Sequence, residues 1–108
     1  MLVNLTPHPI VFEDGFTIPK CDNPPRIQER VVHVGEQFTP NGAMIPIFSK
    51  QFEPDSCVLP PKVEGQYYIV PLFIAQVFAR LRQDLVVIND PIRDEKGQII
   101  GCRSLARV

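Results

Sequence analysis

Residues 67–88 read YYIVPLFIAQVFARLRQDLVVI, and this stretch decides the fold. Residues 67–70 are aromatic and β-branched, which is typical of a strand. Pro71 suits the first position of a helix, where its missing N–H has no cost. The apolar residues that follow recur at i, i+3, i+4 and i+7, at Ile74, Val77, Phe78 and Leu81. This spacing predicts a helix whose apolar face packs on a sheet, followed by an apolar strand at 85–88.

Strand patterns lie on both sides of this stretch. Residues 10–18 contain two apolar runs joined by Asp14-Gly15, a pair that tolerates the positive φ of a tight hairpin turn. Residues 26–34 predict a third strand, and 43–49 an edge strand because Pro46 cannot donate to a ladder. Turn residues fill 35–42, a long loop is expected over 51–66, and Asn89-Asp90-Pro91 predicts a turn. A final hairpin around 95–97 ends in a strand at 99–105.

These elements together predict an α+β fold. We expect a small, mostly antiparallel sheet of short strands and hairpins with one covering helix at about residues 71–83. The length of 108 residues predicts a single domain spanning 1–108. Apolar residues make up 44% and charged residues 21%, so the chain should fold, while 12 prolines exclude most long helices.

The charge and the cysteines limit the partners and the compartment. A net charge of -1 and the absence of a Lys or Arg run disfavour nucleic acid and anionic membranes as partners. No signal peptide and no long apolar span is evident. The three cysteines form no C-x-x-C pair, which indicates reduced thiols. We therefore expect a cytoplasmic protein with no membrane partner.

Known catalytic and metal motifs are absent from the sequence. It contains no phosphate-binding loop, dinucleotide-binding turn, nucleophile elbow or zinc-protease helix. The two histidines and three cysteines lack the close pair spacing of a structural zinc site. No catalytic residue, metal or cofactor is therefore predicted, although a Cys57–His8 nucleophile is conceivable if the fold joins them.

The most unusual local feature is Thr6-Pro7-His8-Pro9. The two prolines push Thr6 and His8 toward extended backbone, so the imidazole sits in a stiff frame. A stiff side chain loses little entropy on binding, which favours His8 as a ligand-contacting group or general base. The plainer interpretation is an imidazole that only caps a loop.

Arg93-Asp94 and the Tyr67-Tyr68 pair are further candidates. Arg93, together with Arg103 and Arg80 or Arg82, would form a planar-donor pocket for a phosphate or carboxylate. The alternative is that Arg93 and Asp94 serve only the turn of the hairpin. One ring of the tyrosine pair should face outward and be able to stack on a base or a protein surface.

Three stretches together resemble a known family: 4–10 (NLTPHPI), 68–70 (YIV) and 84–102, which ends in RDEKGQIIGC. The chain resembles a family of small bacterial and bacteriophage proteins that begin with Asn-Leu-Thr-Pro-His and end with Arg-Asp-Glu-x-Gly-x-Ile-Ile-Gly-Cys. The resemblance implies a compact phage or prophage protein that binds and neutralises a host defence component. The expected ligand-binding residues are Asn4, Thr6, His8, Tyr68, Arg93, Asp94 and Arg103.

The functional expectation is a phage-encoded, non-enzymatic inhibitor of a bacterial defence system. It would bind a bacterial defence protein or sequester a small nucleotide-type ligand. A homo-oligomer is expected, since a chain of this size gains a ligand-sized concavity most easily at a subunit interface. One alternative is a small hydrolase of a nucleotide-like substrate that uses His8 with Asp94 or Cys57. A second is a structural or accessory phage interaction module whose edge strands pair with another chain.

Overall fold

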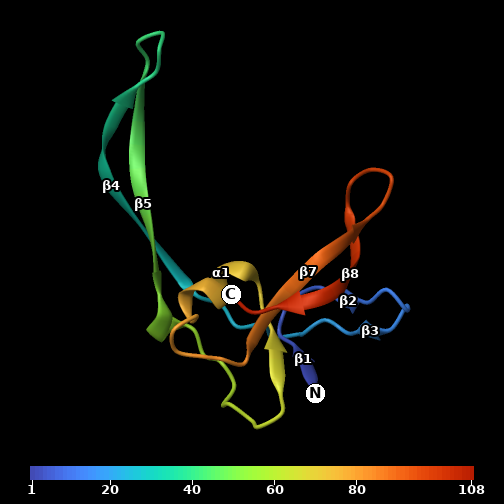
Figure 1. The fold of residues 1–108 in the computed structure, drawn as a ribbon. Coiled ribbons are helices and arrows are strands. Elements are labelled where there is room, and N and C mark those ends of the chain that lie inside the picture. Colours follow the sequence, from blue (N-terminus) through green and yellow to red (C-terminus); the bar gives the residue numbers. More distant parts are fainter. The chain divides into compact units, whose positions relative to one another are not determined.

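The main sheet is mixed rather than mostly antiparallel. In the computed structural model, which describes residues 1–108, four strands lie side by side in the order β1 (Leu2–Asn4), β6 (Tyr67–Ile69), β7 (Leu85–Arg93) and β8 (Ile99–Ala106) (Figure 1). β6 pairs in parallel with both β1 and β7, and only β7 and β8 are antiparallel. The prediction of a mostly antiparallel sheet is therefore wrong here. Its physical reason is that the helix between β6 and β7 returns the chain to the starting end, which makes the two strands parallel.

The helix is real but shorter than predicted. α1 spans Leu72–Val77, and Pro71 lies just before it with ψ of 151°. After Phe78 the chain continues in turns, where Arg82 donates to the carboxylate of Asp84 at 2.8 Å and to the carbonyl of Pro60 at 2.8 Å. These contacts hold 78–84 against the neighbouring loop and direct the chain into β7. Leu81, predicted to lie on the buried face, is 70% exposed because the helix ends before it.

The core of this unit lies under β6, β8 and α1. Ile69, Val70, Ile74 and Cys102 are its most buried side chains. The hairpin of β2 (Ile10–Val11) and β3 (Thr17–Ile18) turns at Gly15 with φ of 90°, as predicted. It packs on β8 so closely that a Cβ at Gly101 would lie 2.9 Å from the carbonyl oxygen of Val11.

The final hairpin is confirmed, with one difference. β7 does not turn at Asn89-Asp90-Pro91 but runs on to Arg93. Asp90 has a φ of 51°, and the register with β8 shifts between Ile92 and Arg93. The reversal occurs at 94–98, where Asp94 accepts a hydrogen bond from the Gly97 N–H. Local turn chemistry therefore determines where this hairpin reverses.

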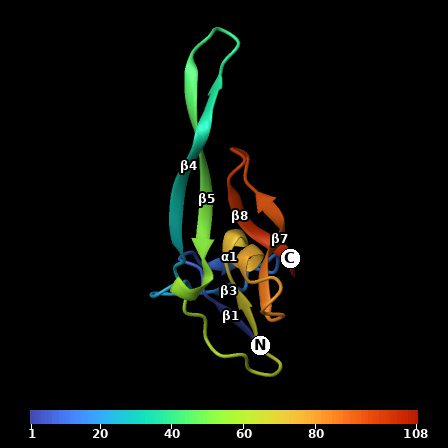
Figure 2. The ribbon, with the colours of Figure 1, turned by 90° about the vertical axis from the view of Figure 1, so that its left-hand side faces the viewer.

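The chain divides into two compact units, one of residues 1–25 with 59–108, described above, and one of residues 26–58. The second unit is an antiparallel ribbon of β4 (Gln28–Phe38) and β5 (Met44–Glu53), followed by the short 3₁₀ helix η1 (Pro54–Ser56). β4 and β5 twist around each other along their length (Figure 2). We call residues 28–53 the arm.

β4 extends four residues beyond the predicted strand, into the expected turn. A bulge between His33 and Gly35, where Gly35 has φ of 155°, lets the ladder continue to Phe38. The turn is confined to residues 39–43, where the Thr39 N–H donates to the Ala43 carbonyl at 2.8 Å. At the other end β5 continues to Glu53, which shortens the loop expected from residue 51. No helix of the structure is long and apolar enough to cross a bilayer.

Candidate functional site

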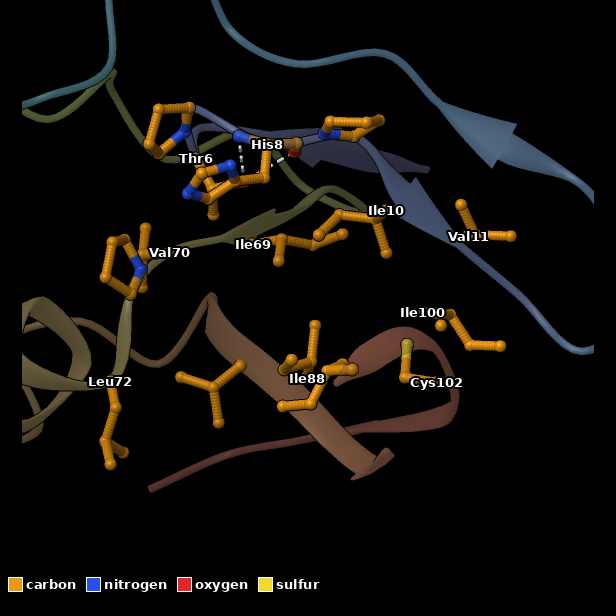
Figure 3. A pocket seen from close by; sticks show the side chains of 16 residues that line it. Thr6, His8, Ile10, Val11, Ile69, Val70, Leu72, Ile88, Ile100 and Cys102 are labelled. Carbon is orange, nitrogen blue, oxygen red and sulfur yellow. Dashed lines mark hydrogen bonds between the residues drawn. The ribbon is translucent and has the colours of Figure 1, made fainter. Parts of the chain in front are cut away.

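One apolar pocket with a volume of about 920 Å³ lies at the carboxyl ends of the parallel strands. Its walls are the loop after β1, the end of β6 with the start of α1, the part of β7 beyond its pairing with β6, and the start of β8 (Figure 3). Parallel sheets usually bind ligands at this end, because the loops that follow the strands diverge there. The volume falls in the range of small-molecule pockets.

The lining of the pocket is almost entirely apolar. None of its residues is Lys, Arg, Asp or Glu. The side chains of Thr6 and His8 are its polar groups, together with the thiol of Cys102. Cys102 is 1% exposed, and burial raises the pKa of its thiol, so the sulfur is neutral and a poor nucleophile near pH 7.

A buried hydrogen-bond network shapes the loop that presents His8. The Asn4 amide donates to the carbonyls of His8 at 2.8 Å and Pro19 at 3.0 Å, and its oxygen accepts from the Thr6 N–H at 2.9 Å. The Thr6 hydroxyl lies 2.7 Å from the Asn4 oxygen and 2.9 Å from the His8 carbonyl, and its single proton serves one of them at a time. Asn4 and Thr6 are thus engaged within the protein and act by positioning the loop.

The imidazole of His8 has no such engagement. The side chain is exposed, and no hydrogen bond or ion pair is made by either ring nitrogen. In Figure 3 it lies on the same side of the pocket as Val70 and Leu72, whereas Ile100 and Cys102 lie toward the other end. The ring therefore offers one free polar contact to a ligand whose body rests on the apolar wall.

The C-terminal segment contributes to the same pocket through a different part than predicted. Arg93 donates to the Gly97 carbonyl at 2.7 Å, and the Asp94 carboxylate accepts from the N–H groups of Lys96 and Gln98, both at 2.9 Å. Arg93 and Asp94 thus hold the hairpin turn. The following residues, 99–102, line the pocket opposite residues 6–11, so both ends of the sequence converge there.

The remaining predicted residues lie outside the pocket lining. Tyr68 is buried, donates its hydroxyl to the Pro61 carbonyl at 3.0 Å and places its ring 6.0 Å from the guanidinium of Arg82. The outward ring of the pair is that of Tyr67. Arg103 forms ion pairs with Glu13 and Asp90. Arg82, Arg93 and Arg103 are therefore each bound to a different partner.

No family model, curated protein or solved structure matches this chain. The evidence for its function is therefore the chemistry of its own surfaces. No three His, Cys, Asp or Glu side chains are grouped so that they could hold a metal ion.

A second surface is the arm, which contains none of the predicted ligand-binding residues but includes the predicted edge strand at 43–49. Every residue of β4 and β5 is exposed except Gly35 and Ser49, which are half-buried. Phe38 is 71% and Met44 62% exposed, and from residue 37 to residue 49 no side chain is charged. An apolar surface of this extent on a two-stranded ribbon indicates an interaction site. The signal was present in the sequence as apolar residues on both faces of the strands, a pattern shared with strands buried in a core.

Proposed function

We propose that this chain is a non-enzymatic binding protein that inhibits a bacterial defence system by binding one of its protein components. The resemblance of its two terminal motifs to small phage and prophage proteins supports the defence context. The observation that supports binding is the convergence of those motifs on one apolar pocket with a single free imidazole. A site built in this way recognises an apolar body that bears one hydrogen-bonding group.

The pocket favours binding over catalysis. A hydrolase needs at least two converging titratable groups, such as a base and a nucleophile or acid. In the pocket His8 is accompanied only by the Cys102 thiol, whose pKa is raised by burial. Asp94 and Cys57 do not line it, and the Asp94 carboxylate is occupied by the hairpin turn. A hydrolase that uses His8 with either residue therefore has no support from the geometry.

Between the two kinds of ligand, an apolar segment of a protein fits better than a nucleotide signal. A nucleotide brings phosphates that proteins usually neutralise with Arg or Lys, and no cation lines the pocket. A leucine or phenylalanine side chain of a target protein would gain roughly 1.5–3 kcal/mol from burial there. One carbonyl or hydroxyl of the same segment would complete the contact with His8.

The experiment compares three forms of the protein in bacteria that carry defence systems. Ile100→Asp places a charge in the pocket wall, whereas Leu81→Asp places the same charge on an exposed apolar residue outside it. We expect the wild type and Leu81→Asp to restore plaque formation by a phage that one of these systems blocks, and Ile100→Asp to lose this effect. Full inhibition by Ile100→Asp, with a folded protein by circular dichroism, would contradict the proposal.

Native mass spectrometry of the three forms, purified from those cells, identifies the bound ligand. A defence protein bound to the wild type and Leu81→Asp but not to Ile100→Asp is the expected result. An intact nucleotide retained in its place would favour the sequestering alternative, and a change in its mass with time would favour the hydrolase.

A further inference from the structure

The arm has two free strand edges. β4 and β5 pair only with each other, so neither strand has a further strand paired along its outer edge. A strand edge without a neighbouring strand can pair with another chain. A two-stranded ribbon is marginally stable in water, and three or more strands are usually needed for independent stability. The arm therefore has both the exposed groups and the energetic reason to add a strand.

The two edges differ in their ability to accept a strand. The Thr39 N–H donates to the Ala43 carbonyl, so the backbone groups of Ala43 point toward β4. Because this direction alternates along a strand, the backbone groups of the even-numbered residues of β5 point away from β4, and Pro46 is one of these residues. Because proline has no N–H, the middle of the β5 edge lacks a donor. The β4 edge has no proline, and the residues opposite the outward positions of β5 point outward too: Glu29, Val31 and His33.

We propose that the β4 edge pairs antiparallel with β4 of a second copy of this chain, centred on Val31. The result is a four-stranded sheet in the order β5-β4-β4-β5. In this register Val31 lies opposite Val31 of the second copy, and Glu29 lies opposite His33 of the second copy. Within one copy the Glu29 carboxylate lies 3.5 Å from Nζ of Lys50, and Nε2 of His33 lies 2.9 Å from the Glu36 carboxylate. These exposed ion pairs would extend across the contact as two symmetry-related Glu29–His33 cross-strand pairs.

The charges and the bulge select this register. A shift toward the start of β4 that centres the pairing on Glu29 would set two carboxylates directly opposite each other, which is destabilising. A shift that centres it on His33 would run Val31 of the second copy against the bulge at Gly35, where the ladder is interrupted. Of the registers centred on Glu29, Val31 and His33, the one about Val31 keeps the paired segment regular and sets no two carboxylates directly opposite each other.

The paired segment is short, which determines the strength of association. It covers about six residues, or roughly 20 Å of strand. Such a contact is smaller than the roughly 800 Å² per partner of a standard stable interface. We therefore expect a concentration-dependent equilibrium between monomer and dimer.

The first test compares two matched proline variants by sedimentation equilibrium from about 10 μM to about 1 mM. Val31 and Lys50 are direct partners in the ribbon, and both point their N–H groups outward, Val31 on the β4 edge and Lys50 on the β5 edge. Val31→Pro removes both central hydrogen bonds of the dimer and should weaken it about 30-fold, equivalent to about 2 kcal/mol. Lys50→Pro, which affects the other edge, should leave the dimer unchanged.

The second test does not depend on a proline being tolerated. Residues in a hydrogen-bonded antiparallel pair have Cα atoms about 5.5 Å apart, a separation that a disulfide can span. Val31→Cys should therefore form a disulfide-linked dimer under mild oxidation, whereas Lys50→Cys and the wild type, with its three native cysteines, should not. A wild type that remains monomeric near 1 mM, equal dimerisation of both proline variants, or cross-linking of both cysteine variants would overturn the proposal.

The pocket has no part in this pairing. Ile100→Asp should dimerise like the wild type, so a failure of the dimer and a failure of the proposed function are separable results.

Discussion

Replacement of Asn4 by alanine is expected to lower the free energy of unfolding by about 3 kcal/mol. The Asn4 side chain is buried and fixes three backbone groups: the carbonyls of His8 and Pro19 and the N–H of Thr6. Alanine removes all three partners at once. The two carbonyls belong to different segments, so the loop after β1 would also lose its connection to the end of the β2–β3 hairpin.

The magnitude follows from the number of groups left without a partner. A hydrogen bond of this kind contributes roughly 1 kcal/mol net, and an unsatisfied buried group costs about 1–3 kcal/mol. Two of the three bonds are only partly buried, so water can reach their carbonyls and the lower figure applies. Three bonds at about 1 kcal/mol give about 3 kcal/mol, a large part of the roughly 5–15 kcal/mol that stabilises a domain of this size.

Urea unfolding followed by far-ultraviolet circular dichroism measures this loss. The matched control is Asn89→Ala, which removes an exposed asparagine with one hydrogen bond, to the Ser104 hydroxyl at 2.8 Å, and should change stability by at most about 0.5 kcal/mol. If Asn4→Ala were no more destabilising than the control, the network would not position the loop. His8 would then lack the rigid frame on which the pocket depends.

Three further predictions concern other parts of the same unit. Asp84→Asn should destabilise the protein by about 2 kcal/mol near neutral pH, because the Arg82 guanidinium loses a charged acceptor. Hydrogen bonds from Arg82 hold the pKa of Asp84 below its ordinary value. The stabilisation is therefore fully present above the unfolded-state pKa of about 3.9 and is lost as the pH falls through the lower folded-state pKa. The free energies of unfolding of the variant and the wild type should converge in acid. Gly101→Ala should cost about 1–3 kcal/mol in urea unfolding, because its methyl group would meet a backbone oxygen that cannot rotate away. The Cys102 thiol should react with iodoacetamide only on unfolding, because burial raises its pKa, whereas the partly exposed Cys21 should react in the folded protein. Equal rates of alkylation at the two cysteines, measured by peptide mass spectrometry, would contradict this burial.

The elements that sequence reasoning predicted well are those determined by neighbouring residues. The turn at Asp14-Gly15 and the reversal after Arg93 depend on side chains within a few positions of the turn, so their chemistry is legible in the sequence. The start of the helix after Pro71 is legible for the same reason. Its end is not, because the contacts that direct 78–84 into turns involve the carbonyl of Pro60, far away in the sequence.

The pocket and the arm depend on non-local pairing, and the sequence does not contain that information in local form. His8 and Ile100 line one pocket only because β1, β6 and β7 are parallel and the β2–β3 hairpin packs on β8. The arm poses the opposite difficulty. Its strands carry apolar residues on both faces, which is the pattern of a strand inside a core. Only the structure, in which no further strand pairs with β4 or β5, shows that these residues face solvent.

The free energy of burying a phosphate and that of burying an apolar side chain distinguish between the two kinds of ligand for the pocket. The side chains of Asn4 and Thr6 form hydrogen bonds within the loop, so a ligand contacts one imidazole and an uncharged wall. A phosphate placed there would lose much of its hydration without a cation to compensate, and the loss for a buried unpaired charge is at least several kcal/mol. Each apolar side chain placed there gains roughly 1.5–3 kcal/mol by burial instead. The free-energy change is unfavourable for the phosphate and favourable for the apolar side chain. We therefore expect the pocket to bind an apolar segment of a protein target in preference to a nucleotide. Substitution of Ile100 by arginine would supply a cation and should shift that preference toward anions.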